Sequence, residues 1–290
     1  EEESAFEYAK KLAIKKNVDI FLGTDPDADR LGVGIKDSTG NFFVLNGNQI
    51  MVVLTNYLLE KEKNKESCFI GSTIVSTPML KNIADQNGVE LKLGLTGFKW
   101  ISKMVEDFPK KRFLCGGEES NGFVVGDFVR DKDAITTALL FCELASDCKK
   151  DNSDVFNYLL DCYIKYGFFK EKLVTIKKDG IDGSMEINRM MEHFRNLKKN
   201  EIAGTKLVSL KDFLSSEKVD FINNKKTNIY LPKSNVLIFE LSDGSEIAVR
   251  PSGTEPKIKF YFSVNTLLKK KNMYFETNKK LDLKLNELIK

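Results

Sequence analysis

Short apolar runs alternate with amphipathic segments over the first 170 residues, and this alternation restricts the chain to an α/β architecture. Strands that alternate with helices at such intervals form βαβ-type units around a shared sheet. We therefore expect a mixed-sheet α/β domain here. Its strands are predicted at 68–70, 89–93 and 113–115, and its helices at 49–60, 78–87, 97–106 and 133–148.

The first 45 residues predict a smaller unit that also contains a helix and strands. Ser4 and Glu7 have the spacing of a capping box, which predicts that a helix begins at Ser4. Residues 18–22 predict a buried strand, and residues 31–35 with 42–45 predict a hairpin.

Beyond about residue 170 the pattern changes to strands joined by turns. The dipeptide Asp243-Gly244 is a hairpin signal between two of these strands. We therefore expect a smaller α+β C-terminal domain. Its strands are predicted at 173–176, 235–241, 246–249 and 257–264, and its helices at 185–197 and 274–289.

Composition excludes several classes of partner and site. The 290 residues include 45 Lys and Arg against 42 Asp and Glu, so the formal net charge is only +3. This balance gives no general attraction for nucleic acid or for an anionic membrane, and we expect neither partner. No apolar run approaches the roughly 18 residues that a membrane span needs. Five cysteines without CxxC spacing predict neither a disulfide framework nor a zinc site, and they favour a cytoplasmic location.

Three acidic residues, Asp25, Asp27 and Asp29, directly follow a predicted apolar strand. Ligands of α/β folds bind where strands end, and carboxylates on a tight loop suit Mg²⁺, which can also accept a phosphoryl oxygen. An EF-hand loop is excluded, because Arg30 and Lys36 stand where Gly and Glu are required. A solvated acidic turn is the alternative, although three neighbouring acids repel one another without a counter-ion.

Two glycines, Gly116 and Gly117, follow the predicted strand at 113–115 and allow a ligand to approach the backbone. Glu118 and Ser120 then offer the acceptor and donor groups that sugar hydroxyls need. A plain surface turn explains the same residues, so this segment alone leaves both interpretations open.

A phosphate cradle is predicted at Arg250, Ser252, Gly253 and Thr254, between two strands of the second half. The guanidinium supplies paired planar donors, the hydroxyls add others, and Gly253 permits backbone N–H groups to turn inward as a nest. A hairpin loop with one surface arginine is the alternative.

Four further polar residues are given simpler predicted roles. Lys99 stands at an expected helix N-terminus, which favours anions. Lys132 is a candidate ligand-facing cation, and Asp133 is predicted to be the N-cap of the following helix. His193, the only histidine, is predicted to be structural.

Five motifs stand in order along the chain: Thr24-Asp25-Pro26-Asp27-Ala28-Asp29-Arg30, Thr96-Gly97-Phe98-Lys99, Gly117-Glu118-Glu119-Ser120, Arg130-Asp131-Lys132-Asp133 and Arg250-Pro251-Ser252-Gly253-Thr254-Glu255-Pro256. Together, from about residue 1 to beyond residue 260, they resemble the α-D-phosphohexomutase superfamily. The Gly-Glu-Glu-Ser form is most similar to the phosphoglucomutase and phosphomannomutase branch.

The resemblance implies a four-domain enzyme with one motif in each domain. Residues 1–45 would be the C-terminal part of domain 2, residues 46–170 domain 3 and residues 171–290 domain 4. The family's catalytic serine lies in domain 1 within a Thr-Ala-Ser-His-Asn-Pro type motif, and no Ser-His-Asn occurs here. We therefore expect a C-terminal fragment that is inactive alone. Its expected partners are a hexose phosphate and the missing N-terminal domains of the same chain.

The resemblance also implies the reaction, which interconverts hexose 1-phosphate and hexose 6-phosphate of glucose or mannose through a phosphoserine enzyme and Mg²⁺. Asp25, Asp27 and Asp29 would hold the Mg²⁺, and Arg30 would act as a catalytic residue that offsets negative charge. The remaining implied contacts are Glu118, Ser120, Lys99 and Lys132 with the sugar or its phosphate, and Arg250, Ser252, Gly253 and Thr254 with the phosphate that is not reacting.

Two alternative functions compete with the mutase. A non-catalytic sugar-phosphate-binding protein would keep the ligand loops and lack the nucleophile. A phosphatase with an aspartate nucleophile is the weaker alternative, because Pro26 and Arg30 have no evident role in that chemistry.

Overall fold

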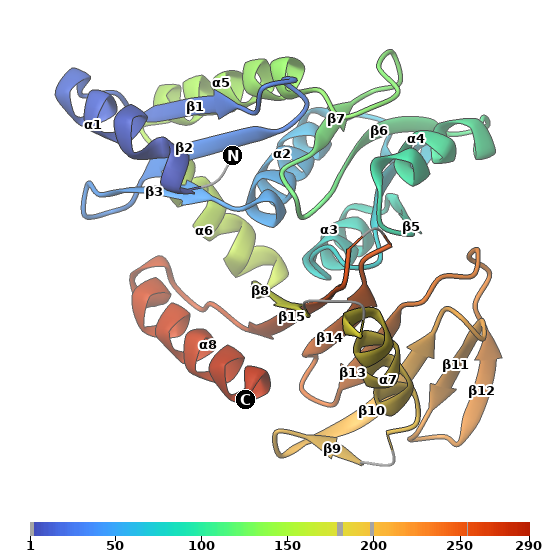
Figure 1. The fold of residues 1–290 in the computed structure, drawn as a ribbon. Helices are drawn as coiled ribbons and strands as arrows, with labels where there is room; N and C mark the ends of the chain where they lie inside the picture. Colours follow the sequence, from blue (N-terminus) through green and yellow to red (C-terminus); the bar gives the residue numbers. More distant parts are fainter. Residues whose placement is uncertain (1–2, 179–181, 198–199, 254) are drawn as a thin grey trace. The chain divides into compact units, whose positions relative to one another are not determined.

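The computed structural model describes residues 3–178, 182–197, 200–253 and 255–290. The chain divides into two compact units, each with its own sheets and helices (Figure 1). In the described residues, every helix is too short or too polar to cross a membrane. Unit 1 comprises Glu1–Gly167 and Leu267–Asn272, and unit 2 comprises Phe168–Thr266 and Met273–Lys290.

Unit 1 holds two sheets. The first is antiparallel with the order β1-β2-β3. The second has the order β5-β4-β6-β7, in which β4 is parallel to β5 and β6 while β7 is antiparallel to β6. The elements are η1 (Glu3–Phe6), α1 (Glu7–Lys16), β1 (Ile20–Thr24), β2 (Leu31–Lys36), β3 (Phe42–Leu45), α2 (Gly47–Lys61), η2 (Lys65–Ser67), β4 (Cys68–Thr73), α3 (Met79–Asn87), β5 (Glu90–Gly94), α4 (Phe98–Asp107), β6 (Arg112–Gly117), β7 (Phe123–Val125), α5 (Ala134–Lys150) and α6 (Val155–Tyr166).

Helices cover both faces of the mixed sheet. Because side chains alternate between the faces of a strand, Phe69 and Ser72 of β4 point in opposite directions. Phe69 packs with Ile101 and Met104 of α4 in a buried cluster. On the other face the Ser72 hydroxyl donates to the sulfur of Met51 in α2. The predicted mixed-sheet α/β domain is therefore confirmed.

Unit 2 contains one antiparallel sheet with the order β12-β11-β10-β13-β14-β15-β8, and β9 pairs with β10. Helix α7 packs on β14 and β15, and α8 packs on β15 and β8. This is the α+β architecture that the sequence predicts. The elements are β8 (Phe168–Lys177), α7 (Gly183–Arg195), β9 (Glu201–Ile202), β10 (Thr205–Asp212), β11 (Glu217–Asp220), β12 (Lys225–Asn228), β13 (Leu237–Leu241), β14 (Glu246–Pro251), β15 (Lys257–Thr266) and α8 (Tyr274–Ile289). The short turn η3 (Lys271–Met273) lies where the chain passes from unit 1 back to unit 2.

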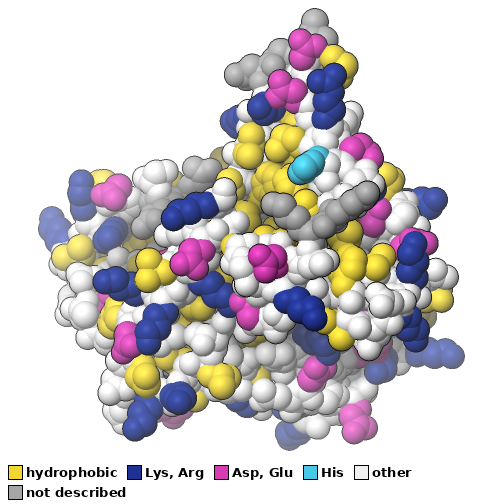
Figure 2. Space-filling model, turned by 90° about the horizontal axis from the view of Figure 1, so that it is seen from below, with side chains coloured by type: hydrophobic (Ala, Val, Ile, Leu, Met, Phe, Trp, Pro, Cys, Tyr) yellow, Lys and Arg dark blue, Asp and Glu magenta, His cyan; other side chains and the backbone are white. Residues whose placement is uncertain are grey.

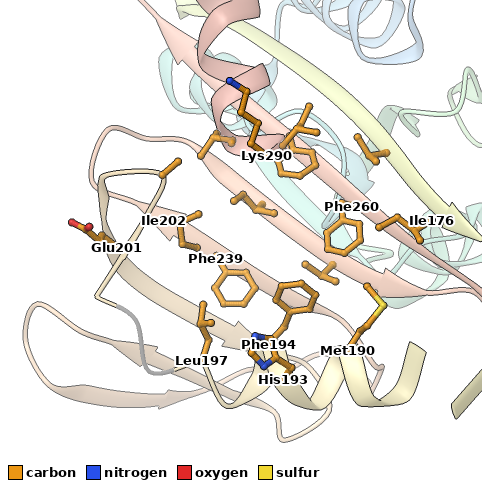
Figure 3. A pocket seen from close by; sticks show the side chains of 17 residues that line it. Ile176, Met190, His193, Phe194, Leu197, Glu201, Ile202, Phe239, Phe260 and Lys290 are labelled. Carbon is orange, nitrogen blue, oxygen red and sulfur yellow. The ribbon is translucent and has the colours of Figure 1, made fainter. Parts of the chain in front are cut away.

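An apolar cavity of about 450 Å³ lies in unit 2 between the sheet, α7 and the end of α8. Phe239 and Phe260 of the sheet and Phe194 of α7 line it (Figure 3). His193 also lines this cavity (Figure 3), and its ring packs edge-on against Phe194 at 5.8 Å between ring centroids. In the space-filling view the histidine, coloured cyan, stands next to hydrophobic side chains (Figure 2). The surroundings of the single histidine are thus mainly apolar.

Two predictions near the N-terminus are wrong. Ser4 lies in a short 3₁₀ turn, and α1 begins after Phe6, which has no side-chain cap bond. Phe6 is buried and its ring contacts Phe21, so packing sets the start of this helix in place of a capping box. The strand predicted to be buried at 18–22 is β1, which begins at Ile20 and is half-exposed because it is an edge strand.

The N-cap prediction at Asp133 is confirmed, because its carboxylate accepts hydrogen bonds from the backbone N–H groups of Ile135 and Thr136. Helix α6, strand β7 and the strands β9 to β12 are not predicted by the sequence pattern. Strand β12, Lys225–Asn228, is exposed along its whole length. It therefore lacks the apolar alternation by which strands are recognised.

Candidate functional site

The acidic residues lie on a closed loop between β1 and β2, which we call the acid loop (residues 25–30). The Oδ1 of Asp25 accepts hydrogen bonds from the backbone N–H groups of Asp29 at 3.1 Å and Arg30 at 3.0 Å. The Ala28 N–H donates to the carbonyl of Asp25, and Ala28 has a left-handed φ of 55°. This turn folds the loop back on itself and brings its first and last carboxylates together.

The three carboxylates form a set of oxygens that fits a hard divalent cation. One carboxylate oxygen each from Asp25, Asp27 and Asp29 lies within 4.8 Å of the others. Burial alone would raise the pKa of Asp25, but the backbone N–H groups of Arg30 and Asp29 outweigh it and lower that pKa. Asp25 is therefore ionised at neutral pH, and oxygen ligands of this kind suit Mg²⁺.

A lysine stands beside these carboxylates. The Nζ of Lys132 lies 2.9 Å from the Oδ2 of Asp29 and 3.1 Å from the Oδ1 of Asp131, and 5.4 Å from the ring centroid of Phe98. Burial would lower the pKa of Lys132, but the two aspartates raise it. The Nε of Arg30 lies 3.7 Å from the Oδ1 of Asp29. Lys132 thus pairs with the acid loop in this structure.

The second predicted site, residues 118–122, follows β6 and is here called the sugar loop. Glu118 is only 6% exposed, and its Oε1 accepts a hydrogen bond from the Gly97 N–H at 2.9 Å. Burial and the neighbouring charge of Glu119 raise the pKa of Glu118. The Glu118 N–H donates to the carbonyl of Gly122 at 2.9 Å, which closes the loop around the half-buried Ser120.

The backbone joins the acid loop to the sugar loop. Arg30 and Gly122 form an antiparallel bridge. The Leu31 N–H donates to the carbonyl of Asn121, and the Asn121 side-chain amide donates back to the carbonyl of Leu31, both at 3.2 Å. A Cβ added at Gly122 would lie 2.4 Å from the Lys132 side chain, so a larger residue there would displace this lysine. Asp29, Lys132 and Glu118 are thereby gathered in one region of unit 1.

Lys99 is placed differently from the other candidates. It is exposed in the first turn of α4, and its Nζ lies 5.5 Å from the ring centroid of Trp100 in the same helix. The structure therefore puts Lys99 at a helix N-terminus, as predicted, and shows it against its own helix.

The predicted phosphate cradle lies in unit 2, in the turn between β14 and β15. Arg250 is half-buried and pairs with Lys259 across the two strands, and the Ser252 N–H donates to the carbonyl of Lys257 at 2.8 Å. Gly253 is exposed, has no left-handed φ, and an added Cβ there would meet open space. Thr254 lies outside the described residues.

Sequence reasoning missed the residues that support the sugar loop. Glu119 accepts hydrogen bonds from Thr73 and Ser76. A Cβ added at Gly47 would lie 2.4 Å from the carbonyl oxygen of Glu119 and 2.5 Å from the nitrogen of Asn121. One sequence feature could have indicated this support. Strand β4 is apolar but ends in the hydroxyl residues Ser72 and Thr73, and α/β folds place functional groups at strand ends.

The chain is similar in sequence to known proteins. The family model described as phosphoglucomutase/phosphomannomutase, alpha/beta/alpha domain III, matches residues 46–163. Phosphoglucomutases of Staphylococcus epidermidis and Staphylococcus aureus are each 38% identical to the chain, over 91% of its length and 48% of theirs. The chain thus spans about half the length of these curated relatives.

Solved structures show the same fold. A putative phosphomannomutase from Thermus thermophilus matches with a TM-score of 0.61 at 17% identity, over 91% of this chain and 46% of that one. The phosphoglucomutase parafusin from Paramecium, in an open form, matches with a TM-score of 0.60 at 20% identity, over 92% and 45%. Residues 46–163 therefore match domain III of the phosphoglucomutase/phosphomannomutase family, and the chain is similar to phosphoglucomutases over about half of their length.

The raised pKa of Glu118 predicts a pH-dependent effect of the variant Glu118→Gln. A carboxyl whose pKa is raised by folding contributes stability that is fully present below its unfolded pKa, about 4.3, and is lost as the pH rises through the folded value. The free energy of unfolding of Glu118→Gln, measured with denaturant relative to wild type, should therefore increase between pH 4 and pH 7.

Glu143→Gln is the control of opposite sign. Hydrogen bonds from Lys61 and Tyr57 lower the pKa of Glu143, so its contribution to stability is present above its unfolded pKa and is lost as the pH falls. The free energy of unfolding of Glu143→Gln relative to wild type should therefore decrease between pH 4 and pH 7. A pH-independent difference for Glu118→Gln would contradict the burial argument.

Proposed function

We propose that this chain contributes the metal, sugar and phosphate sites of a phosphoglucomutase or phosphomannomutase acting on hexose phosphates. The observation that carries the proposal is the backbone pairing of the acid loop with the sugar loop. This pairing sets a carboxylate cluster suited to Mg²⁺ beside groups suited to sugar hydroxyls. Residues 1–45, 46–170 and 171–290 would then be the end of domain 2, domain 3 and domain 4, and the location would be cytoplasmic.

The acid loop would hold Mg²⁺ through Asp25, Asp27 and Asp29. When bound, this ion supplies a Lewis acid that polarises the transferring phosphoryl group. The backbone hydrogen bonds of Asp25 keep its carboxylate ionised and fixed in direction. The cations of Arg30 and Lys132 offset the negative charge that the phosphoryl oxygens bring, because phosphoryl transfer depends mainly on positioning and charge neutralisation.

The sugar loop would orient the hexose. Glu118 accepts a hydrogen bond on one carboxylate oxygen from Gly97, and the second oxygen is the acceptor proposed for a sugar hydroxyl. Ser120 adds a hydroxyl at the tip of the loop, and Lys99 a cation at the start of α4. Each phosphohexose carries hydroxyls and a dianion, so donors, acceptors and cations are all required.

The turn after β14 would hold the phosphate that is not reacting. Arg250 supplies two parallel N–H donors, and Ser252 and Thr254 supply hydroxyls. Gly253 leaves open space in which a phosphate could approach the backbone. An ionised phosphate and a guanidinium form the strong, charge-assisted pairs on which such recognition depends.

The nucleophile of the proposed reaction is a serine outside these residues, since no Ser-His-Asn occurs among the 290. Its phosphate bond would break as a bond forms to the hexose hydroxyl, giving a bisphosphate. The bisphosphate would reorient and return its other phosphate to the serine. A non-catalytic sugar-phosphate-binding protein remains the second candidate, and the missing serine motif is the observation that favours it.

Substitution Asp27→Asn tests the metal site. It removes one charged ligand of three, and we expect the affinity for Mg²⁺ in calorimetric titration to fall by about tenfold or more. Asp19→Asn is the control, because Asp19 is exposed and pairs with Lys149 away from the acid loop. Equal Mg²⁺ affinities for wild type and Asp27→Asn would contradict the ligand assignment.

Substitution Arg250→Ala tests the phosphate site. Loss of a charge-assisted pair should weaken the binding of glucose 6-phosphate by about tenfold or more. Lys279→Ala removes an exposed cation of α8 and should leave the dissociation constant unchanged. If both substitutions weaken binding equally, Arg250 contributes only general charge and the cradle assignment fails.

A further inference from the structure

Glu119 lies in the sugar loop beside Glu118, but its hydrogen-bond partners lie at the end of a different strand. Its Oε2 accepts hydrogen bonds from the hydroxyls of Ser76 at 3.1 Å and Thr73 at 3.3 Å. These two hydroxyls are themselves 2.8 Å apart, so the three groups form a compact triangle. The two hydroxyls have only two protons to donate, so two of the three contacts are hydrogen bonds at any one time. Thr73 is the last residue of β4 and is only 1% exposed, which gives the triangle a rigid base.

The two consecutive glutamates therefore tie the loop to two neighbouring strands. Glu119 is bound at the end of β4, whereas Glu118 is bound to Gly97, which follows β5. Strands β4 and β5 are parallel neighbours in the mixed sheet, so their carboxyl ends lie at the same edge. Gly47 of α2 meanwhile packs against the loop backbone at Glu119. The chain on both sides of Ser120 is thus fixed.

We propose that Glu119 is a positioning residue, which holds Glu118 and Ser120 in the geometry that binds the hexose of a hexose phosphate. The inference rests on the proposed function, which makes Glu118 and Ser120 the sugar contacts. A carboxylate oxygen that accepts from two hydroxyls is held in a fixed direction. If the loop is already ordered, binding does not have to supply the free energy of ordering it. Loss of the triangle should therefore weaken the affinity for the hexose phosphate.

A direct contact between Glu119 and the sugar is the competing role. The structure favours positioning, because the Glu119 oxygen that has partners is already engaged by two hydroxyls of its own chain. The two roles differ in their response to Glu119→Gln. The amide oxygen of Gln can still accept from Thr73 and Ser76, so a positioning role tolerates this change while Glu119→Ala abolishes the triangle.

The experiment measures two quantities on the 290-residue chain with Mg²⁺: the dissociation constant of glucose 6-phosphate, and amide hydrogen exchange without the sugar. The reporter amides are those of Glu118 and Leu31, because they bond to Gly122 and Asn121 and so report closure of the loop. Glu119→Ala and the double variant Thr73→Val/Ser76→Ala should each weaken binding and accelerate exchange by about tenfold or more. Glu119→Gln should stay within about threefold of wild type in both.

Glu60→Ala is the matched control, since Glu60 also accepts two side-chain hydrogen bonds, from Tyr158 and Asn56, but lies outside the loops. This variant should change neither the dissociation constant of glucose 6-phosphate nor the exchange rates of the two reporter amides. Wild-type exchange and affinity in Glu119→Ala and in the double variant would overturn the proposal, as would equal losses in Glu119→Gln and Glu119→Ala. If wild type itself fails to bind glucose 6-phosphate, the proposed function is overturned, whereas the exchange data still decide whether Glu119 holds the loop.

Discussion

The short antiparallel contact of Arg30 and Leu31 with Asn121 and Gly122 is the interaction on which the candidate site depends. It joins two loops that are about 90 residues apart in the sequence. Backbone groups make most of the contact, so its geometry follows from the positions of β2 and β6 more than from any one side chain. Once it forms, Lys132 can fill the space that Gly122 leaves and reach Asp29. The carboxylates and the sugar-loop groups then share one region of unit 1.

Opposite electrostatic environments follow from this arrangement. Asp25 receives two backbone N–H groups that lower its pKa, whereas burial and the charge of Glu119 raise the pKa of Glu118. Carboxyl groups whose pKa values are driven apart by their surroundings are typical of sites that divide chemical roles. Here the division fits the proposal, because a metal ligand must be ionised, while a sugar contact must be held in a fixed direction, as Glu118 is by the Gly97 N–H. Lys132 interacts with carboxyl groups of both loops. It pairs with Asp29, and its positive charge acts to lower the pKa of Glu118.

Local chemistry made part of this predictable from the sequence. The acid loop, the α/β order and the cap at Asp133 depend on residues a few positions apart, so short patterns reveal them. The support of the sugar loop by Gly47 and Glu119 is not local, because it depends on how helices and strands pack. The same reason explains the wrong capping box at Ser4, where burial of Phe6 sets the helix start. Exposed strands such as β12 carry no burial pattern and were missed.

We propose above all that the acid loop is a preformed cation site held beside the sugar loop. A crystal structure of the chain grown with Mn²⁺ in place of Mg²⁺ tests it most directly, because anomalous scattering locates the ion independently of the protein. We expect one strong peak within coordinating distance of oxygens from Asp25, Asp27 and Asp29, with the bridge between Arg30 and Gly122 intact. Carboxylates that point into solvent around an empty loop, with the ion bound elsewhere, would contradict it.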